Sequence, residues 1–268
     1  MKIIIDGLGG DNPLENERAY NEMLHEYDDV ELVFVKEESK EKTMQKSFEI
    51  FKKEEDSVLV SMGETRDLII GVMNNIGIKE GIIRPVFCPI LPTFKGGIVG
   101  LCDSGAIINT SPEHLLQYGL LGSDFIKKTY KIENPRVALL NIGVEEEKGD
   151  DLHREAFKLL QNAHKEGKIN FVGNTESRDF QSGDYDLVVS DGFSGNIMLK
   201  AIEGVVEGLS KRLFKYIPKE ELEFINYHNY GGSALLGAKK LVIKVHGSSD
   251  KTAIKAAIKQ AYDFSSIK

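Results

Sequence analysis

Short apolar runs alternate with amphipathic stretches along the whole chain. Lys2–Asp6, Val30–Val35 and Ser57–Ser61 each place aliphatic residues directly before a polar turn. Runs this short and this rich in β-branched residues predict buried strands. Asp151–Lys165 instead spaces its apolar residues three and four positions apart, which predicts an amphipathic helix. The pattern therefore predicts alternating strands and helices.

The same alternation continues to the C-terminus. Further strands are expected at Arg136–Ile142, Ile169–Val172, Leu187–Ser190 and Leu241–Val245, with a strand pair at Val86–Leu91 and Ile98–Cys102. Further helices are expected at Leu14–Glu26, Thr43–Lys53, Glu113–Thr129 and Lys251–Tyr262, and from Asn196 to Leu213. The charged stretch Lys36–Lys42 is expected to be a loop. This order predicts an α/β fold, a mostly parallel sheet with helices on both faces. We expect one domain over residues 1–268, with two fused lobes around one cleft as the alternative.

Composition narrows the function. The formal net charge of -8 argues against broad binding of nucleic acid, which needs a basic surface. It still permits a local basic patch that an acidic carrier protein would need. Cys88 and Cys102 fit no metal-ligand spacing, and the apolar start of the chain is too short for a signal peptide. We therefore expect a cytoplasmic protein with reduced thiols.

Glycine-rich loops follow several of the predicted strands. In parallel sheets ligands collect beyond the carboxyl ends of the strands, where these loops lie. The loops at Gly7–Asp11 and Asp191–Asn196 could aim backbone N–H groups at an anion. Neither is a P-loop, and neither spells a complete dinucleotide-binding fingerprint. The alternative is that their glycines only make tight turns.

Polar side chains at the same strand ends are candidates for chemistry. Asn174, Asn196 and His246 could each donate a hydrogen bond to phosphate or to an oxyanion, and Lys200 lies one helical turn after Asn196. Turn residues, a local cap and a surface lysine are the alternatives. The acidic run Glu145–Glu147 reads as a solvated turn, so no metal site is expected. His114 and His153 are expected to be surface or capping residues on helices.

Five segments resemble one known family. Asp191-Gly192-Phe193-Ser194-Gly195-Asn196-Ile197-Met198-Leu199-Lys200 looks like the hallmark of the PlsX family, acyl-carrier-protein:phosphate acyltransferases. The Gly231–Ser249 block is the second specific match. Weaker agreement comes from Gly9-Gly10-Asp11, Asn141-Ile142-Gly143 and Gly173-Asn174. The resemblance spans nearly the whole chain.

This resemblance implies a function. Family members transfer a fatty acyl group from acyl carrier protein to inorganic phosphate, and the acyl phosphate feeds phospholipid synthesis. Their fold is similar to that of phosphotransacetylases and isopropylmalate dehydrogenases, they are usually homodimeric, and no cofactor is expected. Members also carry a helical hairpin linked to peripheral membrane contact, and part of it is missing here between Glu203 and Tyr230.

The resemblance and the loop chemistry together define the expected site. The catalytic residues expected are Asn174, Asn196, Lys200 and His246. The residues expected to bind phosphate or substrate are Gly9, Gly10, Asp11, Asn141, Asp191, Gly192, Ser194 and Gly195. Backbone N–H groups of the two glycine loops are expected to hold the phosphate.

Some positions depart from the family pattern. Glu64 and Arg66 stand where the family has Asn and Gly, and Ile107 stands where it has Asn. The basic loop expected before Met44 is missing, and the chain is shorter than typical members. Two alternatives therefore stay open: a short-chain acyl-CoA phosphate acyltransferase, and an inactive family member that acts as a binding or scaffold protein.

Overall fold

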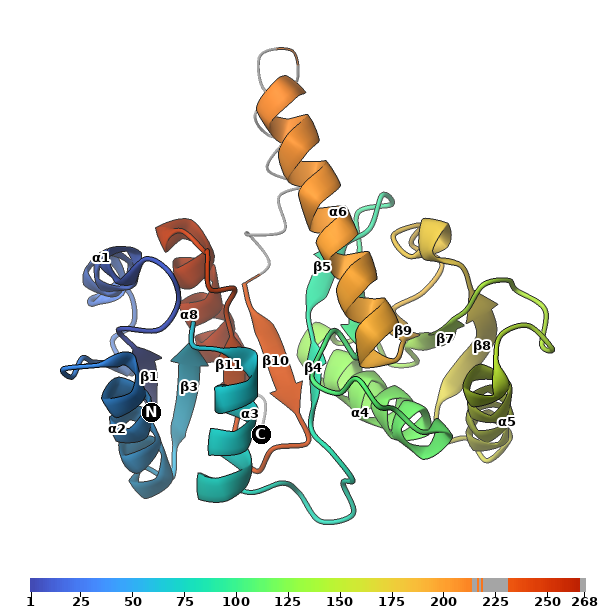
Figure 1. The fold of residues 1–268 in the computed structure, drawn as a ribbon, viewed down its shortest axis with the longest axis horizontal. Coiled ribbons are helices and arrows are strands. Elements are labelled where there is room, and N and C mark those ends of the chain that lie inside the picture. The colour runs from blue at the N-terminus through green and yellow to red at the C-terminus, as the bar shows by residue number, and fades with distance from the viewer. Residues whose placement is uncertain (214–215, 217, 219–230, 266–268) are drawn as a thin grey trace. The chain divides into compact units, whose positions relative to one another are not determined.

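The computed structural model of the protein describes residues 1–213, 216, 218 and 231–265 (Figure 1). The chain divides into two compact units, Met1–Pro85 with His228–Lys268, and Val86–Tyr227. Each unit has its own sheet core with helices packed against it.

The sheet of the first unit is mostly parallel. Its strands are β1 (Lys2–Asp6), β2 (Glu31–Val35), β3 (Ser57–Ser61), β10 (Ser233–Leu236) and β11 (Val242–Lys244), in the spatial order β2-β1-β3-β11-β10. β10 and β11 form the antiparallel pair, whereas β1 runs parallel to both of its neighbours. The helices are α1 (Pro13–Met23), α2 (Lys40–Lys53), α3 (Thr65–Asn75) and α8 (Lys251–Ser265). α2 contacts β1 and β3, while α8 contacts β3 and α1.

β1 lies between β2 and β3, and this internal position explains its apolar sequence. Ile3, Ile4 and Ile5 are all completely buried although successive side chains of a strand point to opposite faces. Both faces of β1 are therefore covered. A parallel strand covered on both faces shows a continuous apolar run, as the first residues of this chain do.

The second unit has a five-stranded sheet of its own. β5 (Ile90–Pro92), β6 (Ile98–Cys102), β7 (Arg136–Leu140), β8 (Asn170–Thr175) and β9 (Leu187–Val189) are ordered β5-β6-β9-β7-β8. Only the β5–β6 pair is antiparallel among these described strands. β4 (Val86–Cys88) contacts β6. The remaining elements are α4 (Pro112–Tyr130), α5 (Asp151–Lys165), α6 (Gly192–Leu213) and the 3-10 helix η1 (Ser177–Asp179).

Helices pack against this second sheet through distinct clusters. α4 contacts β6 and β9, and α5 contacts β8 (Figure 1). Met198 of α6 joins the buried cluster that contains Leu101, Leu140 and Val188. The start of α6 is therefore fixed to the strands that precede the predicted site loops.

The predicted α/β fold is confirmed, although the structure has two mostly parallel sheets where the sequence predicted one. α5 has the predicted bounds. Two predicted helix starts differ, and one strand was missed. α2 begins at Lys40 inside the expected loop, because Ser39 caps it by accepting a hydrogen bond from Lys42 N at 3.2 Å. α6 begins at Gly192, so the expected Asp191–Asn196 loop is mostly the first helical turn. β10 was not predicted.

The helices of the described residues include none long and apolar enough to cross a membrane. Much of the segment between Glu203 and Tyr230 that the resemblance links to membrane contact, Tyr230 included, lies outside the described residues.

Replacing a core residue of β1 tests this packing. Ile4→Ala should lower the free energy of unfolding by about 2–5 kcal/mol, because it removes a fully buried side chain and leaves a cavity. Leu14→Ala, whose side chain is 63% exposed, should change it by less than about 0.5 kcal/mol. Urea unfolding followed by circular dichroism measures both. Equal destabilisation by the two variants would contradict the assigned burial.

Candidate functional site

Three neighbouring strand ends form one edge of the second unit. β6, β9 and β7 are adjacent and parallel, so their carboxyl ends lie at the same side of the sheet. Asp103 follows β6, Asp191 follows β9, and Asn141 follows β7. This edge carries most of the residues that the sequence predicted for phosphate binding.

A buried carboxylate organises the loop after β6. Asp103 Oδ1 accepts hydrogen bonds from the backbone N–H groups of Ser104, Gly105 and Ala106 at 2.7, 3.1 and 3.0 Å, and Oδ2 accepts one from Ile107 at 2.8 Å. Burial raises the pKa of Asp103, and these four hydrogen bonds act in the opposite direction. The carboxylate therefore holds residues 103–107 in a compact turn.

The first turn of α6 packs directly on this turn. A Cβ atom at Gly195 would lie 2.0 Å from the Asp103 carbonyl oxygen, and one at Gly192 would lie 2.3 Å from the Ile107 carbonyl oxygen. Asn196 Nδ2 donates a hydrogen bond to the Ser104 carbonyl oxygen at 3.0 Å. The glycines of the family-like segment therefore serve a close approach between two backbones.

Asp191 caps the same helix. Its Oδ1 accepts hydrogen bonds from the N–H groups of Phe193 and Ser194 at 3.0 and 2.9 Å, and its carbonyl oxygen accepts one from Gly195 N at 3.0 Å. These three amides were expected to hold phosphate. They already have partners inside the chain, so phosphate binding through them would require Asp191 to give them up.

His153 links the starts of α5 and α6. Its Nδ1 lies 2.6 Å from Asp150 Oδ1, and its Nε2 lies 3.8 Å from Asp191 Oδ2. Asp150 is the N-cap of α5 and also accepts a hydrogen bond from His153 N at 3.0 Å. The sequence predicted only a surface or capping role, because nothing in the spacing from 153 to 191 signals this contact.

Two asparagines fix the loop that connects β7 to α5. Asn141 Nδ2 donates to the Lys148 carbonyl oxygen at 3.0 Å, and Asn174 Nδ2 donates to the Glu145 carbonyl oxygen at 2.8 Å. Asn174 lies within β8 rather than after it, and its Oδ1 is buried with no hydrogen-bond partner among the described residues. One N–H of the Asn174 amide is therefore used inside the chain, and its group without a partner is an acceptor.

Lys200 lies on the exposed side of α6 near Glu203. Burial raises the pKa of Glu203, and the positive charge of Lys200 partly offsets this rise. Lys200 therefore brings a cation one turn after Asn196, as the sequence predicted.

The first unit gathers its own strand-end loops. Gly9 N donates to Asp6 Oδ1 at 3.1 Å, and Ser61 Oγ donates to Asp6 Oδ2 at 2.8 Å. Asp11 N donates to the Gly247 carbonyl oxygen at 2.8 Å. Burial raises the pKa of Asp6, and its hydrogen bonds act against this rise. These amides, like those of α6, are therefore used inside the chain rather than left open for an anion.

Two cationic or polar side chains stand beside those loops. His246 is exposed, and its Nδ1 lies 2.8 Å from Ser248 Oγ. Lys40 Nζ donates to the Gly10 carbonyl oxygen at 2.5 Å. The sequence does not single out Lys40, because the charged stretch Lys36–Lys42 predicts a loop. This lysine supplies a cation at the Gly9–Asp11 loop although the expected basic loop is missing.

Three residues differ from the family pattern: two are exposed, and the third contributes a backbone hydrogen bond. Glu64 and Arg66 are exposed. Ile107 uses its N–H to bond Asp103, so the lost asparagine side chain does not disturb that turn.

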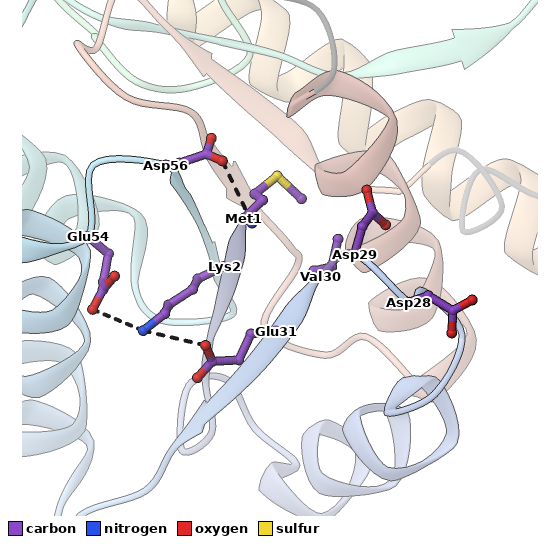
Figure 2. Close-up of a pocket in the computed structure, with 8 residues that line it drawn as sticks. All are labelled: Met1, Lys2, Asp28, Asp29, Val30, Glu31, Glu54 and Asp56. Atoms are coloured by element: carbon purple, nitrogen blue, oxygen red, sulfur yellow. Dashed lines mark ion pairs between the residues drawn. The ribbon is translucent and has the colours of Figure 1, made fainter.

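One pocket of about 460 Å³ lies at the opposite, amino end of the first unit's strands (Figure 2). Lys2 Nζ forms ion pairs there with Glu54 at 3.0 Å and Glu31 at 3.5 Å, and the N-terminal amine lies 3.7 Å from Asp56. None of the predicted site residues lines it. We therefore do not assign it to the predicted site.

Substitution of the contact glycine tests the packing of α6. Gly195→Ala should destabilise the protein by about 1–3 kcal/mol or more, because its Cβ would overlap a backbone carbonyl oxygen that cannot swing away. Gly204→Ala in the same helix is the matched control, since a Cβ there meets nothing within 4 Å. It should leave stability unchanged or raise it by up to about 1 kcal/mol. Calorimetric melting that shifts equally in both variants would refute the contact.

Comparison with known proteins agrees with this architecture. The profile of a family described as fatty acid synthesis protein matches residues 20–267. The chain is 35% identical to a phosphate acyltransferase from Thermoanaerobacter pseudethanolicus, over 98% of this chain and 93% of that protein. It is 36% identical to a phosphate acyltransferase from Bacillus pumilus, with the same two coverages.

The alignment also shows that this chain is shorter than its relative. The alignment to the Thermoanaerobacter protein has 315 positions, whereas this chain has 268 residues. The relative therefore carries segments that this chain lacks, which confirms the prediction of a shortened member.

The fold also resembles a solved structure. A phosphotransacetylase from Staphylococcus aureus superimposes with a TM-score of 0.69 at 14% identity, covering 99% of this chain and 94% of that one. This likeness confirms the predicted fold. With the sequence matches, it leads to one conclusion: the chain belongs to the PlsX family of fatty acid synthesis proteins.

Proposed function

We propose that this chain is a phosphate acyltransferase that moves a fatty acyl group from acyl carrier protein to inorganic phosphate. The observation that carries the proposal is the similarity to phosphate acyltransferases at 35–36% identity over 98% of the chain. The product, an acyl phosphate, would supply phospholipid synthesis. The family-like segment 191–200 supports the proposal, because it follows a strand end and forms the start of α6, where Gly192, Gly195 and Met198 are buried.

The chemistry requires positioning more than proton transfer. An oxygen of phosphate attacks the thioester carbonyl carbon, a C–O bond forms, and the C–S bond breaks to release the thiolate of the carrier. Phosphate is itself the nucleophile, so the protein has to hold it beside the carbonyl and stabilise the oxyanion.

Side chains are better suited to this task here than the loop amides. The amides of Phe193 and Ser194 bond Asp191, and that of Asp11 bonds Gly247. We therefore propose that Lys200 attracts phosphate and that Asn196 donates its second N–H to phosphate or the oxyanion. His246 is proposed as a further donor.

The remaining proposed residues orient these groups. Asn141 and Asn174 would shape the loop after β7, and Asp191, Gly192, Ser194 and Gly195 would set the first turn of α6. Gly9, Gly10 and Asp11 would do the same for the first unit, next to Lys40.

Partners follow from the same proposal. Acyl carrier protein is the proposed acyl donor, and a homodimer in the cytoplasm with weak peripheral membrane contact is the proposed state. No metal or organic cofactor and no nucleic acid is required by the reaction.

A direct assay tests the activity. Purified protein given acyl-carrier-protein thioester and phosphate should release acyl phosphate, measured by trapping with hydroxylamine. Rates on matched coenzyme A thioesters should be lower. Faster turnover of short-chain coenzyme A thioesters would favour the acyl-CoA alternative. Carrier binding without any phosphate-dependent turnover would favour the scaffold alternative.

Single substitutions test the proposed donors. Asn196→Ala and His246→Ala should each lower the rate of acyl phosphate formation by roughly 10²–10³, the usual effect of losing an oxyanion donor. Asn75→Ala and His25→Ala, which change exposed residues of the same types, are the controls and should keep the wild-type rate. Full activity in both site variants would refute their assigned roles.

A further inference from the structure

The starting observation is a histidine held between two carboxylates at the proposed phosphate edge. His153 Nδ1 contacts Asp150 Oδ1 at 2.6 Å, and His153 Nε2 faces Asp191 Oδ2 at 3.8 Å. The side chains of His153 and Asp191 are only 15% and 11% exposed. The contact therefore lies in a partly desolvated place, where a charge is felt more strongly than at the surface.

Hydrogen bonding fixes the orientation of the ring. An ionised carboxylate only accepts hydrogen bonds, so the short contact to Asp150 requires a proton on Nδ1. The hydrogen bond from His153 lowers the pKa of Asp150, which agrees with an ionised partner. An imidazolium would present its second N–H to Asp191.

The loop before α5 packs closely against the Cβ of His153. A Cβ at Gly149, whose φ is +92°, would lie 2.8 Å from His153 Cβ and 2.6 Å from Asn141 Oδ1. The loop before α5 therefore closes against both side chains. Other charged groups lie nearby. Arg154 pairs with Asp151 at 2.5 Å and also lowers the pKa of Asp150, and the Asp103 carboxylate lies beside Gly192 at the start of α6.

The Asp191 carboxylate would repel a phosphate bound nearby, and a positive charge on His153 would weaken that repulsion. The same carboxylate caps the first turn of α6, the helix from which Asn196 and Lys200 are proposed to bind phosphate. Two anions at one place repel each other, and the effect is larger where water is partly excluded. A cation on the far side of Asp191 would offset the repulsion without occupying the phosphate position.

We propose that His153 is a positioning residue that holds Asp191 in place and, in its charged form, offsets the negative charge that an incoming phosphate meets. The proposal rests on the proposed function, because it needs phosphate to bind beside Asp191. It assigns His153 no contact with the substrate. Replacing His153 should therefore change the affinity for phosphate in a way that depends on pH, and should change the KM of the thioester little.

The main test compares phosphate binding at two pH values. His153→Gln should raise both the dissociation constant of phosphate and its KM about fivefold at pH 6. This ratio to wild type should fall towards one at pH 8.5, because only a protonated ring can offset negative charge. Equilibrium dialysis with radiolabelled phosphate gives the first value, and acyl phosphate formation gives the second. Phosphate itself changes its protonation between the two pH values. Dividing the value for the variant by that for wild type at the same pH cancels this effect, because it is the same for both proteins.

Two further variants separate positioning from a general loss of structure. His164→Gln alters the other histidine of α5, whose Nδ1 lies 3.2 Å from the Ile169 carbonyl oxygen, and should leave phosphate affinity unchanged. Asp150→Asn keeps an N-cap of equal quality but removes the anion beside Nδ1. It should raise the phosphate dissociation constant in the same direction as His153→Gln, by a smaller factor.

The outcomes are distinct. Wild-type phosphate affinity in His153→Gln at pH 6, or an effect that stays the same at pH 8.5, overturns the proposal. A parallel rise in the KM of the thioester with a lowered melting temperature also overturns it, because it indicates a structural role only. If the wild-type chain binds phosphate but makes no acyl phosphate, the proposed function fails while dialysis still tests His153. If the wild-type chain binds no phosphate, both fail.

Discussion

The close contact between the first turn of α6 and the 103–107 turn is the constraint on which the second unit depends. Two backbones approach so closely that a Cβ at Gly195 would overlap the Asp103 carbonyl oxygen. The approach is possible because Asp103 first gathers four backbone N–H groups and shapes the turn that α6 meets. Asn196 and Asp191 then act from a helix start whose position is already fixed.

In the first unit, the buried carboxylate of Asp6 likewise organises a strand-end loop by accepting hydrogen bonds. Asp6 ends β1 as Asp103 follows β6, and it is bound by Gly9 N and Ser61 Oγ. Burial raises the pKa of both carboxyls above the ordinary value. A raised pKa means that the folded state holds its proton more tightly than the unfolded chain does. The stabilisation from that proton is complete at low pH and is lost as pH rises through the raised pKa. The hydrogen bonds reduce this loss, because they favour the ionised form.

Sequence patterns predicted the parts of the fold that depend on local periodicity. The bounds of α5 follow from its amphipathic repeat, and those of β1 and β3 follow from their aliphatic runs. Predictions were weaker where a polar residue changes the outcome: the single Ser39 cap turned an expected loop into the start of α2. β10 was missed because only its pairing with β11 makes Ser233–Leu236 a strand.

In the candidate site, too, some features could be predicted from the sequence and others could not. Which loops lie at strand ends could be predicted, because the carboxyl ends of parallel strands share one edge. How their amides are used could not, since the capping of α6 by Asp191 depends on where the side chain turns. Contacts such as Asn196 with Ser104, or His153 with Asp191, join residues far apart in sequence and have no local signal.

Occupied amides change what kind of anion site this protein can offer. A helix start with open N–H groups attracts phosphate through fixed dipoles that do not titrate. Here the Asp191 carboxylate accepts hydrogen bonds from two N–H groups of the helix start and adds a negative charge. Attraction of phosphate would therefore have to come from side chains such as Lys200. The formal net charge of -8 gives no general attraction for an anion. Under the proposed function, phosphate recognition would therefore rest on a few local cations, whose attraction for an anion is screened by salt.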